Sequence, residues 1–198
     1  MSQGLTAYLV PRDEVLAAPG SGDRELVTDI LESFAEDIEQ LDSDFETGDP
    51  DCWEGPTAAG AVAELIGSRP SMDEDDAGLY ATAFELVCRY YGAWASNNYF
   101  SPCRVEWFNR LDGILTAGGV PLSLVNLWCI APPLRPPWDR LLEFGHWSAG
   151  AMLAASAPLG RLLPTVADAE ERAALVTVAG WLRAAEAAPG SILVGFFR

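Results

Sequence analysis

Residues 191–198, SILVGFFR, decide what kind of fold this chain forms. β-Branched and aromatic side chains, which are enriched in strands, make up half of this stretch. Pro189 and Gly190 stand directly before it and break any helix that arrives there. We therefore predict a strand at the C-terminal end.

A second strand is predicted in residues 4–11, GLTAYLVP, where apolar and polar residues alternate until Pro11, and a helical turn follows at residues 11–16. Strands at both ends of a helical middle favour pairing of the two in one small sheet. The predicted class is therefore α+β, dominated by helix. The chain has 198 residues, 49% of them hydrophobic, which is enough for a full core and predicts a single domain, residues 1–198.

The residues between the two strands show the apolar spacing of helices, with caps and breakers at their ends. The predicted helices cover residues 23–41, 57–67, 75–94, 101–118, 148–157 and 168–188. Trp94 is expected on the buried side of the third helix and Val105 on that of the fourth. Ser101 and Ser148 are expected to cap their helices, and Pro158 to end the fifth.

Acidic residues are concentrated in the first part of the chain. Residues 1–76 hold 20 Asp and Glu against three Arg, a net charge of −17, whereas residues 77–198 hold nine acids and nine Arg. Every basic residue is Arg, since the chain contains no Lys. The sequence thus divides into an acidic N-terminal part, residues 1–76, and a neutral helical part, residues 77–198.

This charge pattern excludes several classes of function. Nucleic acids and anionic membrane surfaces repel so acidic a protein. The absence of Lys removes Schiff-base chemistry and the P-loop lysine. Residues 113–134 carry no charge, but Gly and Pro interrupt them, so we predict a buried connection and no membrane span. The N-terminus has neither a basic region nor an extended apolar core, so we expect a cytoplasmic protein.

The richest acidic stretch, residues 40–55 (QLDSDFETGDPDCWEG), is the first candidate for a metal site. An EF-hand loop counted from Asp42 requires Gly at position 6 and Glu at position 12, where the chain has Thr47 and Trp53. We therefore predict that residues 42–54 form a solvated loop without calcium. Four widely spaced Cys and one His also lack zinc-site spacing, so no metal or cofactor is predicted.

The strongest candidate for chemistry is the stretch PPWDRLLEFGHWSAG, residues 136–150. His146, the only His, has Asp139 and Glu143 nearby, and a His beside a carboxylate can act as a general base. Trp138 and Trp147 would line a binding site there. The alternative is a structural, hydrogen-bonded His146.

A second cluster, WASNNYFSPCRVEWFNR in residues 94–110, contains Asn, Arg and several aromatic residues. It could line a small-molecule pocket, which is typically apolar with a few fixed polar groups. The alternative is a turn at residues 96–98 followed by a capped helix.

The chain also resembles a known kind of family in four stretches: LTAYLVPRDEVLAAPGSGDREL, WFNRLDGIL, VPLSLVNLWCIAPPLRPPWDRLLEFGHWSAGAMLAA and WLRAAEAAPGSILVGFFR. These are similar to an uncharacterised bacterial domain-of-unknown-function family of actinobacterial type. A looser likeness is to YfbM-like proteins. The resemblance implies a shared fold and supplies no catalytic residues.

Two classes of function remain. The first is a non-catalytic binding protein, such as an inhibitor or immunity protein, whose acidic part meets a basic partner protein. Its binding residues would be Glu36, Glu39, Asp42 and Asp44. The second is an enzyme or ligand-binding protein that uses residues 138–148 for a small molecule. Acidity that only keeps the protein soluble is the alternative to the first class.

Overall fold

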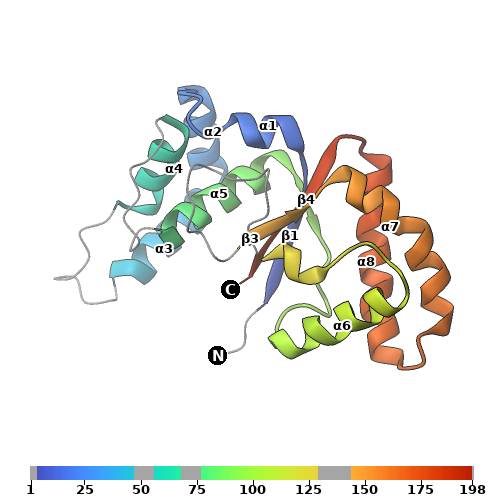
Figure 1. Ribbon diagram of the computed structural model, residues 1–198. Helices are drawn as coiled ribbons and strands as arrows, with labels where there is room; N and C mark the ends of the chain where they lie inside the picture. Colours follow the sequence, from blue (N-terminus) through green and yellow to red (C-terminus); the bar gives the residue numbers. More distant parts are fainter. Residues whose placement is uncertain (1–3, 47–55, 68–76, 129–143, 198) are drawn as a thin grey trace. The chain divides into compact units, whose positions relative to one another are not determined.

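The computed structural model describes residues 4–46, 56–67, 77–128 and 144–197 (Figure 1). The chain divides into two compact units. The first, which we call the sheet unit, comprises Met1–Arg12, Gly92–Leu134 and Leu142–Arg198. The second, the helical unit, comprises Asp13–Tyr91 and Arg135–Leu141. The single-domain organisation stays a prediction.

The sheet unit is built on a four-stranded antiparallel sheet in the order β2-β1-β4-β3. Its strands are β1 (Leu5–Pro11), β2 (Ala93–Ala95), β3 (Phe144–Trp147) and β4 (Ser191–Phe197). β1 and β4 pair along their whole lengths, from Leu5 opposite Phe197 to Pro11 opposite Ser191, and lie side by side in Figure 1. The predicted α+β class and the pairing of the two terminal strands are confirmed.

The sequence did not predict the two outer strands, β2 and β3. They are three and four residues long, too short to show a clear alternation of apolar and polar residues. Trp94 was expected on a buried helix face, but it lies in β2 opposite Tyr8 and is 57% exposed. The helix ends before it because residues 93–95 pair with β1 instead.

One row across the sheet consists only of small residues. Ala95, Ala7, Gly195 and Gly145 stand directly opposite one another on β2, β1, β4 and β3. Residues directly opposite one another share a face of the sheet. The backbone of Leu127 approaches this row so closely that a Cβ atom on Gly195 would lie 2.6 Å from the Leu127 carbonyl oxygen.

Helices of the sheet unit cover this same face. They are α6 (Val105–Ala117), η2 (Leu124–Leu127), α7 (Ala149–Leu162), η3 (Leu163–Thr165) and α8 (Ala169–Ala187). The core between helices and sheet includes Phe108, Leu127, Trp147, Trp181 and Leu193. The carboxylate of Asp112 on α6 holds η2 in place by accepting hydrogen bonds from the N–H of Leu124, at 2.6 Å, and from the Ser123 hydroxyl.

Two predicted helix boundaries in the sheet unit were wrong. α6 begins at Val105, with Arg104 and not Ser101 as its N-cap, and Val105 is 40% exposed. α7 begins as predicted, since the Ser148 hydroxyl accepts a hydrogen bond from the N–H of Ala151, but it continues through Pro158 to Leu162. Leu159 is fully buried in the core, and burying such a side chain, worth about 1.5–3 kcal/mol, offsets much of the roughly 3 kcal/mol that an internal Pro costs.

The helical unit contains α1 (Arg12–Ala17, which begins at the unit boundary), α2 (Arg24–Ser33), α3 (Ala35–Glu46), α4 (Ala58–Gly67) and α5 (Ala77–Tyr91). α4 packs against α2, α3 and α5. The predicted helix at residues 23–41 is interrupted at Phe34, whose ring lies 4.5 Å from the guanidinium carbon of Arg89. α3 then continues to Glu46, so residues 42–46, which were predicted as loop, are helical; residues 47–55 lie outside the described part of the chain.

Among the helices that the structure describes, none combines the length and apolar character that a membrane span requires. Of the uncharged residues 113–134, the described part holds the end of α6 and the short η2. Leu124 and Leu127 are buried in the core there, whereas residues 116–119 are exposed, so the described part is a buried connection only in part.

The close contact at Gly195 yields a prediction for stability. Gly195→Ala would place its Cβ 2.6 Å from the Leu127 carbonyl oxygen and 2.8 Å from the Leu127 Cβ, and relief requires movement of backbone. We expect the free energy of unfolding, measured with urea, to fall by about 1–3 kcal/mol. Gly160→Ala in α7 is the control, because nothing lies within 4 Å of its new Cβ. Equal stability of Gly195→Ala and the unaltered protein would contradict the close contact.

Candidate functional site

The negative charge of the chain belongs to the helical unit. The residues of this unit include 22 acids and five Arg, a net charge of −17. The sheet unit has seven acids and seven Arg, a net charge of zero. The predicted division at residue 76 therefore falls inside the helical unit. The division into the two units gives the same net charges as the predicted one, −17 and zero.

Four carboxylates of α2 and α3 form what we call the acidic face: Glu25, Glu32, Glu36 and Glu39. All four are exposed, and none of their side chains makes a hydrogen bond or ion pair with another described residue. Two of them, Glu36 and Glu39, are binding residues predicted from the sequence. Like charges one helical turn apart repel slightly, so a cation placed between them would relieve that repulsion.

Other acids of the same helices already have partners inside the helical unit. Asp23 caps α2 by accepting from the N–H groups of Glu25 and Leu26. Asp29 accepts from the Tyr90 hydroxyl at 2.9 Å, and this hydrogen bond raises the pKa of Tyr90. Asp37 pairs with Arg89 at 2.5 Å. These carboxylates make contacts within the helical unit. The acidic face comprises exposed carboxylates of the same helices that make no such contacts.

Asp42, a third predicted binding residue, also has a structural partner. It is half-buried in α3, four residues before that helix ends, and its carboxylate accepts from the N–H of Ala58, the first residue of α4, at 2.6 Å. A carboxylate favours the positive end of the helix dipole there. Asp44, the fourth, lies in α3, but its side chain is outside the described part of the structure.

The contact of Asp42 predicts a loss of stability when it is removed. Asp42→Ala takes away an acceptor from the start of α4, so we expect the free energy of unfolding to fall by about 0.5–2 kcal/mol in urea titrations. Asp42→Asn keeps an acceptor oxygen without the charge and should lie between. Glu39→Ala, an exposed change on the same helix, should stay within about 0.5 kcal/mol. A larger loss for Glu39→Ala than for Asp42→Ala would refute this role.

His146, the predicted catalytic candidate, is a buried residue of β3. It stands opposite Val194 and is only 7% exposed. Its Nδ1 atom is buried and has no hydrogen-bond partner within the described residues. Burial, and after it the positive charge of Arg12, lowers the pKa of His146 from the usual 6.5. The imidazole is therefore neutral at pH 7, and one nitrogen lacks the partner that buried polar groups ordinarily have.

The other residues predicted around His146 are only partly placed. Trp147 is 1% exposed, and its indole N–H donates to the carbonyl oxygen of Ser123 at 2.8 Å, so it belongs to the core of the sheet unit. Trp138, Asp139 and Glu143 lie outside the described residues. A pairing of His146 with either carboxylate thus stays a prediction.

The lowered pKa of His146 gives stability a pH dependence. Since the folded state binds this proton less readily than the unfolded state, lowering the pH through 6.5 favours unfolding. We expect the free energy of unfolding to decrease more between pH 7.5 and 5.5 for the unaltered protein than for His146→Leu, because the carboxylates are common to both. Guanidinium titrations at both pH values measure this difference. Parallel pH profiles would show that His146 does not contribute.

The described thiols do not provide a nucleophile. Cys88 is fully buried and Cys103 partly buried, and both are free. Burial raises the pKa of the Cys88 thiol well above its usual value and that of Cys103 to about 11. Both are therefore protonated at neutral pH, whereas a nucleophilic cysteine is a thiolate.

The second predicted cluster is divided between the core and the surface. Phe100 is fully buried, and the Asn97 side-chain amide donates to the carbonyl oxygen of Leu5 at 2.7 Å, as a structural turn requires. Tyr99, Arg104 and Trp107 line an open hollow of about 330 Å³ at the start of α6. Three residues predicted for a pocket thus line this hollow, and a small-molecule site there stays a prediction. The turn, predicted at residues 96–98, lies at residues 97–100, where the N–H of Phe100 donates to the Asn97 carbonyl oxygen at 2.7 Å.

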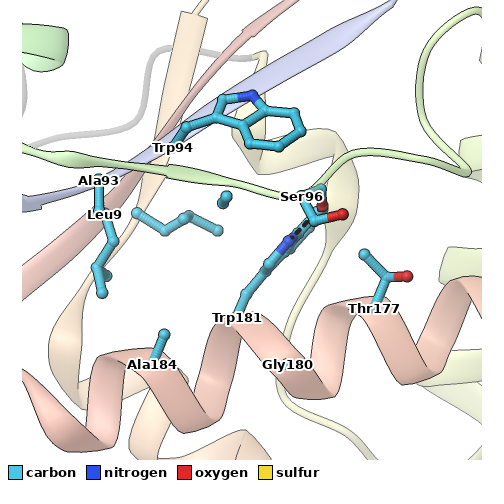
Figure 2. Close-up of a pocket in the computed structure, with 10 residues that line it drawn as sticks. Leu9, Ala93, Trp94, Ser96, Thr177, Gly180, Trp181 and Ala184 are labelled. Atoms are coloured by element: carbon cyan, nitrogen blue, oxygen red, sulfur yellow. Dashed lines mark hydrogen bonds between the residues drawn. The ribbon is translucent and has the colours of Figure 1, made fainter.

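A second hollow, a groove between β2 and α8, was not indicated by the sequence (Figure 2). Its volume is about 370 Å³. On the α8 side it is lined by Thr177, Gly180, Trp181 and Ala184. Each of these residues follows the previous one by one helical turn or less. Small residues at this spacing are the only signal in the sequence, and they are common in a chain so rich in Ala and Gly.

Metal binding has no candidate in the parts of the chain that are described, because no three His, Cys, Asp or Glu residues come together there. Most of the acidic stretch 40–55 falls outside those parts. The absence of calcium therefore stays a prediction.

Comparison with known proteins gives a family without an activity. A family model described as "Domain of unknown function (DUF7691)" matches residues 1–198. The chain belongs to the DUF7691 family. No curated protein and no solved structure matches it. The resemblance to an uncharacterised domain family is thus confirmed, and membership of DUF7691 assigns no catalytic residues.

Proposed function

We propose that this DUF7691 protein is a non-catalytic binding protein whose acidic face meets a basic partner protein, in the manner of an inhibitor or immunity protein. The observation that carries the proposal is the acidic face itself. Four exposed carboxylates on α2 and α3 have no partner within the described residues, while neighbouring acids are used inside the unit. A cationic surface would supply the missing counter-charge.

Electrostatics of this kind acts mainly on the rate of encounter. One exposed ion pair contributes only about 0–1 kcal/mol, so the acidic face would add little affinity pair by pair. A net charge of −17 confined to one unit, however, creates a field that attracts a basic protein and orients it. Such attraction weakens with salt, because the Debye length is about 8–10 Å under physiological conditions.

The proposal predicts which charges control association. The bait is the intact protein, and its basic partner is captured at low salt from lysate of the source organism and then purified. Glu36→Lys with Glu39→Lys should lower the association rate constant about tenfold in surface plasmon resonance and leave dissociation nearly unchanged. The effect should shrink at about 0.15 M salt.

A matched control changes the same amount of charge elsewhere. Glu106→Lys with Glu170→Lys alters two exposed acids of the neutral sheet unit. Asp42 is left intact because it supports α4. Equal slowing by both double variants would show that net charge alone matters and that the acidic face is not the binding surface. Failure to capture any basic protein would refute the proposal.

A second candidate function is a small-molecule enzyme or ligand-binding protein that uses residues 138–148. It is favoured by the buried Nδ1 of His146, which lacks a partner that a ligand could provide. Native mass spectrometry of protein purified from its source organism would detect a retained small molecule. This molecule should be lost on His146→Leu but kept in the acidic-face double variant.

Origin and location belong to the same proposal. A chain without Lys and rich in Ala, Gly, Pro and Arg is typical of a GC-rich bacterial genome. We propose a bacterial, cytoplasmic protein with a loose likeness to YfbM-like proteins, which meets its partner there without nucleic acid or membrane.

A further inference from the structure

The groove between β2 and α8 lies wholly within the sheet unit and has the features of a small ligand site (Figure 2). Its volume of about 370 Å³ is near the lower end of the range for small-molecule pockets, about 300–1,000 Å³. Leu9 of β1 and Leu193 of β4 form its floor. Trp94 lines the rim and is turned away from Leu9 and Trp181 in Figure 2.

Two of the three polar side chains in the walls have partners within the protein, and the third, the Ser96 hydroxyl, belongs to an exposed residue. The Trp181 indole N–H donates to the carbonyl oxygen of Ser96 at 2.7 Å, the dashed line in Figure 2. The Thr177 hydroxyl donates to the carbonyl oxygen of Ala173 at 3.3 Å. An apolar ligand could therefore enter without leaving the Trp181 indole or the Thr177 hydroxyl unpaired, and the binding energy would come from burial of apolar surface.

A positive charge stands beside this apolar groove. Gly180 lines the groove, and the Nη2 atom of Arg183 lies 4.0 Å from the position that a Cβ on Gly180 would occupy. Arg183 makes no ion pair or hydrogen bond with any other described residue. A guanidinium is a fork of N–H donors that matches a carboxylate. The groove thus offers an apolar surface and, next to it, an unused cation.

We propose that this groove binds a small carboxylate with an apolar body. The body lies along Leu9, Leu193 and the indole of Trp181, and the carboxylate pairs with Arg183 at the rim. An apolar ligand without charge would leave Arg183 unused, and a cation would be repelled by it. The inference is independent of the proposed partner protein, because none of its residues belongs to the helical unit.

Octanoate is the probe, with 1-octanol as an uncharged ligand of the same length. Binding to the full chain is followed by NMR through the indole N–H of Trp181, assigned by its loss in Trp181→Phe. We expect both ligands to shift this resonance in a saturable way. Arg183→Gln changes an exposed residue, so the fold should survive; it should weaken octanoate about tenfold and leave 1-octanol unchanged.

Filling the groove tests its location. Gly180→Leu should abolish binding of both ligands, and there is room for the new Cβ, whose nearest neighbour is the Arg183 Nη2 at 4.0 Å. Gly160→Leu in α7 is the control and should leave both affinities unchanged. The proposal is overturned if octanoate does not bind, if Gly180→Leu binds it normally, or if Arg183→Gln weakens both ligands equally. Circular dichroism confirms that each variant is folded.

Discussion

The sheet unit depends on the close approach of Leu127 to Gly195 in the central strand. A Cβ atom at position 195 would meet the backbone of η2, and the residues opposite Gly195 on the neighbouring strands, Ala7 and Gly145, are small as well. With η2 against the sheet, Leu124 and Leu127 enter the core. The adjoining Ser123 carbonyl oxygen then accepts the indole N–H of Trp147. The contact between Leu127 and Gly195 therefore helps to hold η2 against the face of the sheet that the helices cover.

The acids of the helical unit are distinguished by their partners and not by their number. Asp23, Asp29, Asp37 and Asp42 are tied to helix ends, a tyrosine and an arginine within the unit. They are part of what holds α2, α3, α4 and α5 together. The glutamates of the acidic face make no such contacts with other described residues, so their replacement should test the proposed binding with little effect on the fold.

One side of α8 packs in the core of the sheet unit, and another lines the groove beside β2. Its buried side, with Leu175, Val178 and Leu182, fills the core under the sheet. Trp181 stands at the border, where its indole N–H holds the backbone of Ser96 just after β2. The neighbouring small residues then leave the groove open beside the edge of the sheet. The hydrogen bond that anchors β2 to α8 thus also shapes the proposed ligand site.

The amino-acid sequence was enough to predict the two long terminal strands, most helices and the separation of charge, because these follow from local composition, periodicity and caps such as Ser148. It misplaced Trp94 and the end of α7, since strand pairing and the burial of Leu159 are decided by residues distant in the chain. The sequence indicated both Glu36 and His146 as candidate site residues. It did not predict which residues contact them. Which carboxylates have partners and where a groove opens could not be predicted, because both depend on which side chains of separate elements meet in space.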